Sequence, residues 1–277
     1  MTAPDRDHTS ASRGGKSVTR VGAAAAGIAG TVFVLLLALP MLSLFLRIPP
    51  GQLLGRLGTP TVVQALRLSL VTSLASTGGA VLLGLPVAYV LATHDFPGKR
   101  LLEVVIDLPM VLPPTVAGLG LLLAFGRMGI AGRALAALGV TIPFTTLAVV
   151  LAGMFVAGPF LVITARAGFE QVDPRLLRAA STLRASPGYT FLRVVLPLSL
   201  PSLTAGAAMT WARALGEFGA TITFAGSLPG KTQTMPLAVY QALETDVDAA
   251  VALSVILLLF SFGLLLALRS VRATWQR

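Results

Sequence analysis

The stretch that decides the fold is Asp173–Pro201, DPRLLRAASTLRASPGYTFLRVVLPLSLP, a short basic segment between two long apolar segments. Asp173 is a favourable N-cap residue, and Pro174 suits the first position of a helix. The residue before a proline disfavours the helical region, so Ser186 marks the end of the run. The sequence therefore predicts a basic helix of about three turns over residues 174–185.

The two sides of this basic helix differ in chemistry. Leu176, Ala180 and Leu183 share one face at spacings of four and three, whereas Arg175 and Arg178 pair on another. An apolar face outside the long apolar segments needs a partner to cover it. We therefore predict that the helix is a docking surface, formed by Arg175, Leu176, Arg178, Ala179, Ala180, Leu183, Arg184 and Ser186.

The composition of the chain is that of a polytopic membrane protein. Of 277 residues, 55% are hydrophobic and only 12% are charged, and the mean hydropathy is +0.84. The net charge of +10 does not indicate nucleic-acid binding, because the cations lie between apolar segments and are not interleaved with aromatic residues. The chain has no cysteine, and His8 and His94 are far apart, so the sequence predicts neither a metal site nor a cofactor.

Six segments are long and apolar enough to span a bilayer, which takes about 20 residues of helix. They are residues 21–46, 62–92, 101–125, 143–165, 194–214 and 249–268. The sequence thus predicts an all-α fold of six transmembrane helices joined to the short basic helix. The third segment holds Pro109, Pro113 and Pro114, so we do not expect one regular helix through it.

The distribution of lysine and arginine predicts the orientation. These residues are retained on the cytoplasmic side, and most of the 21 lie in the terminal tails, the loop at residues 99–100 and the loop that carries the basic helix. Both termini and the docking surface should therefore face the cytoplasm. The apolar segments should lie in the lipid of the plasma membrane. We expect cytoplasmic tails at 1–20 and 270–277, with the first tail disordered.

A pair of opposite charges stands at the end of the fifth apolar segment, in RALGEFGATITFAG at 213–226. Each charge costs about 3 kcal/mol at the bilayer centre, so Arg213 and Glu217, four residues apart, should pair along one helix face. The pair lies either at the membrane interface or inside the bundle at a gate. For an anionic cargo, Arg213 and the hydroxyl of Thr221 would offer hydrogen-bond donors, while Glu217 would repel it.

The loop after the fourth segment resembles that of permease subunits of bacterial ABC importers. Their pattern is Glu-Ala-Ala, three residues, Gly, nine residues, an aliphatic residue, one residue and Leu-Pro. Ala179-Ala180, Val194 and Leu196-Pro197 match it, while Arg178 and Arg184 stand at the positions of the Glu and the Gly. The resemblance identifies residues 174–185 as a coupling helix that docks an ATPase subunit.

Three further stretches are similar to the molybdate-type permeases of the molybdate and sulfate permease family, within the binding-protein-dependent type I importers. They are LPMVLPPTVAGLGLLLAFGRMG at 108–129, LGEFGAT at 215–221 and AGSLPGKTQTMPLAVYQALE at 225–244. The likeness covers about residues 62–269, which would form the transporter's transmembrane domain after a separate first helix at 21–46.

This resemblance implies an importer in which two permease copies form one pathway for a tetrahedral oxyanion. An ATP-binding subunit dimer and an external oxyanion-binding protein would be its partners, and the chain itself would not be an enzyme. The implied pathway and gate residues are Pro113, Pro114, Arg213, Gly216, Glu217, Phe218, Gly219 and Thr221.

Alternatives remain at this point. Sulfate and thiosulfate permeases share the Gly-Glu-aromatic-Gly core, although the extended run after it favours molybdate or tungstate. A secondary transporter that works without ATP is the rival from another class. Residues 226–232, GSLPGKT, resemble a phosphate-binding loop but are one residue too short between the glycines, so we predict no ATP site there.

Overall fold

The computed structural model describes residues 12–275, which contain helices and no strand. The chain divides into two compact units, Met1–Pro49 and Pro50–Arg277. Five helices are long and apolar enough to cross a membrane, or six if one sharply bent pair counts as a single span. The predicted all-α membrane fold is therefore confirmed.

The first unit consists of one helix, α1 (Ser12–Arg47), whose apolar portion Ala25–Arg47 is long enough to span a bilayer. Its large apolar side chains are exposed, with 66% of Leu36 and 69% of Leu39 accessible. Lipid is the environment in which such a surface is stable. The helix begins within the segment that we expected to be a disordered tail, and residues 1–11 of that tail lie outside the described residues.

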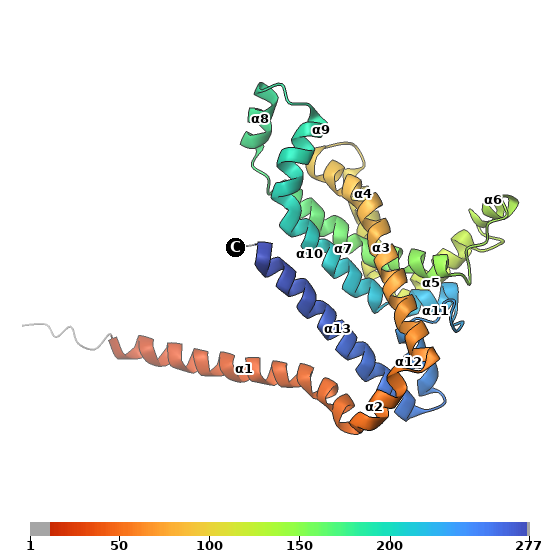
Figure 1. Ribbon diagram of the computed structural model, residues 1–277. Coiled ribbons are helices and arrows are strands. Elements are labelled where there is room, and N and C mark those ends of the chain that lie inside the picture. Colours follow the sequence, from red (N-terminus) through yellow and green to blue (C-terminus); the bar gives the residue numbers. More distant parts are fainter. Residues whose placement is uncertain (1–11, 276–277) are drawn as a thin grey trace, which may run out of the picture. The chain divides into compact units, whose positions relative to one another are not determined.

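Four long helices form the frame of the second unit (Figure 1). They are α3 (Pro60–Thr93), α7 (Thr146–Glu170), α10 (Leu196–Leu215) and α13 (Val247–Trp275). Small residues bring them together, because a Cβ on Gly153 of α7 would lie 2.6 Å from the Ser76 hydroxyl oxygen of α3. Just before α10 the chain forms α9 (Pro187–Thr190) and a π-helical turn, η1 (Phe191–Val195).

The third predicted span is two helices, α4 (Lys99–Val111) and α5 (Pro114–Phe125), which meet at 117°. Leu112 and Pro113 between them are extended, with ψ angles of 136° and 132°. Each of these residues precedes a proline, which disfavours helical backbone there. Residues 101–125 therefore do not form one continuous helix, and the axis of α5 points in a different direction from that of α4.

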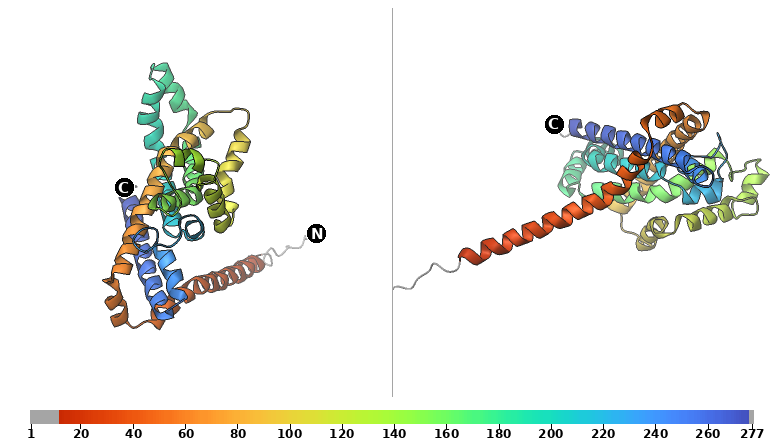
Figure 2. Two further views of the ribbon diagram at one scale, coloured as in Figure 1. Left: turned by 90° about the vertical axis from the view of Figure 1, so that its right-hand side faces the viewer. Right: turned by 90° about the horizontal axis from the view of Figure 1, so that it is seen from below.

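Shorter helices gather at the end of the second unit opposite α8 (Pro174–Thr182), as Figure 1 and the left view of Figure 2 show. They are α2 (Pro50–Leu57), α11 (Gly219–Ala225) and α12 (Met235–Leu243). A further short helix, α6 (Gly132–Ala137), lies in the connection between α5 and α7.

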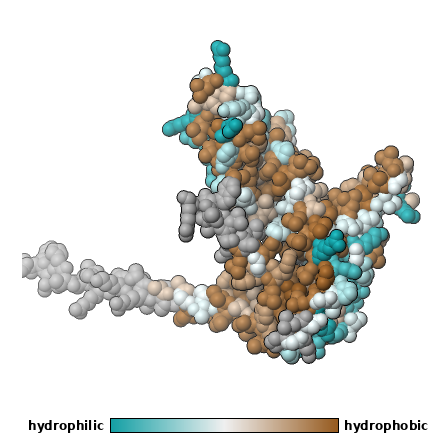
Figure 3. Space-filling model, viewed as in Figure 1, coloured by the Kyte–Doolittle hydropathy of each residue, from teal (hydrophilic) through white to brown (hydrophobic). Residues whose placement is uncertain are grey.

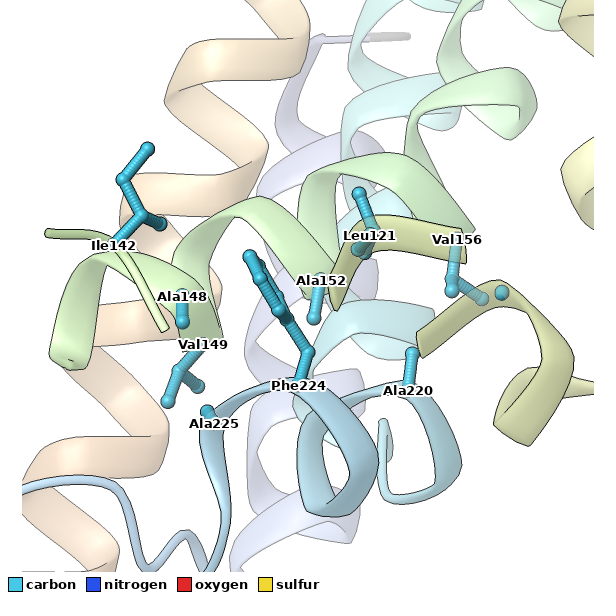
Figure 4. Packing of buried hydrophobic residues seen from close by; sticks show 10 residues of the cluster. Leu121, Ile142, Ala148, Val149, Ala152, Val156, Ala220, Phe224 and Ala225 are labelled. Carbon is cyan, nitrogen blue, oxygen red and sulfur yellow. The ribbon is translucent and has the colours of Figure 1, made fainter. Parts of the chain in front are cut away.

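The buried ring of Phe224 holds α11 in place (Figure 4). It packs in one cluster with Ala148 and Ala152 of α7 and with Leu121 of α5. On the face shown in Figure 3 the long helices are largely hydrophobic, and hydrophilic side chains stand out at the tip formed by α8 and again around α11 and α12.

Candidate functional site

Helix α8 begins where the sequence predicts, but it ends before the predicted residue. The Asp173 carboxylate accepts a hydrogen bond from the Arg175 backbone N–H at 2.8 Å, so Asp173 caps the helix. The helix stops at Thr182 and not at residue 185, because Arg184 has a left-handed backbone with φ of 54°. The Arg184 and Ala185 amides bond back to the carbonyls of Ser181 and Ala180, at 3.0 and 3.1 Å, which closes the helix end.

The docking surface is hollowed by a groove of about 760 Å³ between α8 and the segment that follows it. Most of the predicted docking residues line it, whereas Arg175 and Arg178 do not. The lining is Leu176, Ala179, Ala180, Leu183, Arg184, Ala185, Ser186, Tyr189 and Val194. Leu183 and Tyr189 are 83% and 58% exposed, so the groove presents uncovered apolar side chains.

Tyr189 was not among the predicted docking residues. The Ser186 hydroxyl accepts a hydrogen bond from the Tyr189 N–H at 3.3 Å, so Ser186 both ends the loop and caps α9. A serine followed by proline at the first helical position was the available signal for that second helix. Its consequence, a tyrosine facing back toward α8, depends on how the chain turns between the two helices.

Arg213 and Glu217 form the expected ion pair at the other end of the unit. The Arg213 Nη1 lies 2.8 Å from the Glu217 Oε2, and 32% of the Arg213 side chain but only 2% of the Glu217 side chain is exposed. The second carboxylate oxygen, Oε1, accepts a hydrogen bond from the Ala220 N–H of α11 at 2.8 Å. Oε1 of Glu217 is therefore hydrogen-bonded, whereas the buried Oε2 contacts Arg213 as an ion pair without a hydrogen bond.

A pocket of about 300 Å³ opens beside this ion pair, and we call it the gate pocket after the role that the sequence predicts for its residues. Its lining is Pro114, Thr115, Arg213, Gly216, Glu217, Phe218 and Gly219. All of these except Thr115 were predicted from the sequence. Two predicted residues, Pro113 and Thr221, do not line the pocket, and Thr221 is 1% exposed in the packing of α11.

Two glycines set the contact between α5 and α11 at the gate pocket. A Cβ on Gly219 would lie 2.6 Å from the Pro114 Cβ, and one on Gly118 would lie 2.7 Å from the Ala220 carbonyl oxygen. Real Cβ atoms do not approach other atoms so closely. The bend at Pro113 and Pro114 is thereby held directly against the segment that carries Glu217.

The loop at residues 226–232 uses its amides internally. The backbone N–H groups of Lys231, Thr232 and Gln233 all bond to the Leu228 carbonyl, at 2.9–3.0 Å. Gly230 provides the left-handed turn, with φ of 70°. In a phosphate-binding loop such amides point toward the ligand, whereas here they bond to a carbonyl of the same loop.

Residues 80–272 match the family model described as the binding-protein-dependent transport system inner membrane component. The chain belongs to this family. The match includes α8, the docking groove and the gate pocket, so both sites lie within the part of the chain that defines the family.

Several curated members of the family are similar along most of their length. The molybdenum transport system permease protein ModB of Mycobacterium tuberculosis is 47% identical over 230 residues, 83% of this chain and 86% of the relative. The protein of the same name from Escherichia coli K12 is 42% identical over 66% of this chain and 80% of the relative. The sulfate transport system permease protein CysT of Synechococcus elongatus is 36% identical over 86% of this chain and 87% of the relative.

Solved permeases share the fold. A bacterial ABC transporter involved in the import of alginate superposes with a TM-score of 0.74 at 14% identity, covering 95% of this chain and 99% of that chain. The MetNI methionine ABC transporter gives 0.62 at 19% identity, covering 78% and 97%. Together with the family match, this shared fold makes the chain a multi-pass membrane protein with the ABC importer architecture.

Proposed function

We propose that this chain is the permease subunit of an ATP-driven importer that carries molybdate, or a similar tetrahedral oxyanion, across the plasma membrane. The observation that carries the proposal is the 47% identity to a molybdenum permease over 83% of the chain. The structure supports it with a partly exposed arginine in the gate pocket, where an anion would pass.

Arg213 is suited to guide an oxyanion without trapping it. A guanidinium has five N–H donors in a fixed plane, and a tetrahedral oxyanion accepts them as charge-assisted hydrogen bonds. One nitrogen is held by Glu217. The carboxylate fixes the orientation of Arg213 and neutralises its charge, which keeps anion binding weak enough for release.

ATP hydrolysis belongs, in this proposal, to a separate dimer of ATPase subunits that docks on the groove at α8. The uncovered Leu183 and Tyr189 would be buried by that partner. Arg178, which is exposed on α8, would face an acidic part of the ATPase surface. This places α8 and both termini in the cytoplasm, in agreement with the distribution of lysine and arginine.

A second permease copy would complete the pathway, and an external binding protein would deliver the oxyanion to the end that carries α11 and α12. ATP-driven movement of the ATPase subunits would shift α8, so that the gate pocket opens alternately to either side. Sulfate is the second candidate cargo, because CysT relatives are 36% identical over 86% of the chain.

Transport by the reconstituted complex tests the proposal. The permease is inserted into vesicles with its ATPase and binding protein, and uptake of radiolabelled molybdate is measured with and without ATP. We expect uptake that needs ATP and all three components, and that unlabelled molybdate suppresses better than sulfate. Uptake by the permease alone along an ion gradient would instead identify a secondary transporter, and preferential suppression by sulfate would reassign the cargo.

A further inference from the structure

An arginine bridges two helices at the α8 end of the unit, away from the gate pocket. The Arg166 Nη1 of α7 lies 2.8 Å from the Glu103 Oε1 of α4, and its Nε lies 2.7 Å from the Glu170 Oε1 of α7. The three side chains are 31%, 25% and 45% exposed, respectively. One guanidinium thus makes one bond between helices and one bond within its own helix.

The position of this cluster connects it to α8. Glu170 is the last residue of α7, and Asp173, which caps α8, follows after two residues. Because that connection is so short, α8 cannot move far without displacing the end of α7 that holds Arg166. The Arg166–Glu170 pair therefore lies at the end of α7 that is connected directly to α8.

The same cluster also holds the arm that ends at the gate pocket. Helix α4 packs mainly against α7, and through the bend at Pro113 it continues into α5. The first residues of α5, Pro114 and Thr115, line the gate pocket, and Gly118 touches Ala220 of α11. The α4–α5 arm is therefore fixed at one end by Glu103 and at the other by close contacts with α11.

We propose that Arg166 is a positioning residue that transmits the movement of α8 to the gate through Glu103. This inference rests on the proposed function and names the side chains that link its two sites. A charge-assisted bond suits the task, because breaking a partly buried pair from one side leaves an uncompensated charge. The two helices therefore move together while the pair is intact.

Only one of the two bonds of Arg166 is local to a single helix. The Arg166–Glu170 bond spans four residues of one helix and would stabilise α7 alone. The Arg166–Glu103 bond joins helices that are distant in sequence. A cavity of about 260 Å³ beside it, bordered also by Asp107, leaves space for the two helices to shift.

Three carboxylates around one arginine allow a matched test. Glu103→Gln, Glu170→Gln and Asp107→Asn each remove one negative charge at the same cavity with almost no change in size. In vesicles that contain the full complex, molybdate uptake and phosphate release are measured together. For Glu103→Gln we expect uptake per ATP hydrolysed to fall by about tenfold, a usual size for coupling between two sites, while ATP hydrolysis continues.

The two controls should keep the parent ratio of uptake to ATP hydrolysis to within about twofold, because both leave the charged pair between Arg166 and Glu103 intact. An exchange of charges, Glu103→Arg with Arg166→Glu, should restore much of the ratio that Arg166→Glu alone loses. This double variant also answers the objection that a single change merely disturbs assembly.

Two failures are distinguishable. If the parent complex takes up no molybdate with ATP, the proposed function is wrong. If the parent is active but Glu103→Gln remains fully coupled, or if all three amide variants lose coupling equally, the role assigned to Arg166 is wrong.

Discussion

Glu217 holds Arg213 with one carboxylate oxygen and the amide of Ala220 with the other, both at 2.8 Å. The side chain is 2% exposed, so this carboxylate joins the end of α10 to the start of α11 inside the protein. The carboxylate lies against the arginine, and this pairing should reduce the repulsion that we expect it to exert on an anion.

Replacement of Glu217 should separate its charge from its hydrogen bonding. Glu217→Gln keeps an oxygen for the Ala220 amide and leaves the Arg213 charge unbalanced. We expect a KM for molybdate lowered severalfold together with a slower maximal rate, because the anion leaves Arg213 less readily. Glu217→Ala should in addition destabilise the protein by about 1–3 kcal/mol through the unpaired amide. An unchanged KM in Glu217→Gln would contradict this.

Addition of one methyl group between α5 and α11 should disturb the gate. Gly118→Ala would place a carbon 2.7 Å from the Ala220 carbonyl oxygen. We expect a loss of about 1–3 kcal/mol in stability and a marked loss of uptake, measured by thermal unfolding in detergent and by transport. Gly120→Ala on the same helix is the control, since nothing lies within 4 Å of its Cβ position. Equal behaviour of the two variants would refute the close contact.

Substitution by glycine should change the stability of α8 in opposite directions at its left-handed end, Arg184, and inside the helix. Arg184→Gly should stabilise the helix end by roughly 0.5–1 kcal/mol. Glycine removes the strain of the positive φ, and this gain exceeds the loss that comes from the greater entropy of glycine in the unfolded chain. Arg178→Gly, inside the same helix, should destabilise it by about 1 kcal/mol. Hydrogen exchange of the α8 amides should slow in the first variant and quicken in the second.

Docking of the ATPase should depend on the charge of Arg178. Arg178→Glu should weaken binding by up to about fivefold, which corresponds to about 1 kcal/mol for an exposed ion pair. Arg193→Glu makes the same change outside the predicted docking residues and should bind as the parent does. Pull-down with purified ATPase checks both variants. Tighter binding by Arg178→Glu would show that the ATPase surface opposite Arg178 is not acidic.

Asp246 should make the start of α13 sensitive to acid. Hydrogen bonding from the Ala249 N–H, aided by Arg56, lowers the pKa of Asp246 below its ordinary value of 3.8. The stabilisation is therefore complete above about pH 3.8 and is lost as the pH falls through the lowered value. At neutral pH, Asp246→Ala should reproduce this loss as faster amide exchange in the first turn of α13, whereas Glu244→Ala should not.

Local chemistry explains which features were predictable. The cap at Asp173 and the pairing of Arg213 with Glu217 depend on residues within four positions, and both were deduced correctly. The end of α8 was placed three residues too late, because an arginine does not itself signal a left-handed backbone. The glycine that the family pattern has at position 184 was the available signal.

Contacts between distant segments could not be predicted from the sequence. Thr115 enters the gate pocket only because the chain turns by 117° before it, and no local pattern gives that angle. The bond from Arg166 to Glu103 likewise depends on how α4 lies on α7. The proline-rich stretch did indicate that a regular helix would fail, although not the direction in which the chain would go.

The corner at Leu112 and Pro113 has a consequence for solvation. Pro113 and Pro114 have no N–H to offer, so the carbonyls one turn before them, on Pro109 and Met110, lose their helical partners. Hydrocarbon cannot satisfy such oxygens, and irregular backbone at membrane depth persists only beside protein or a hydrated space. The corner should accordingly border a wet vestibule, and the oxyanion would keep part of its water shell as it reaches Arg213.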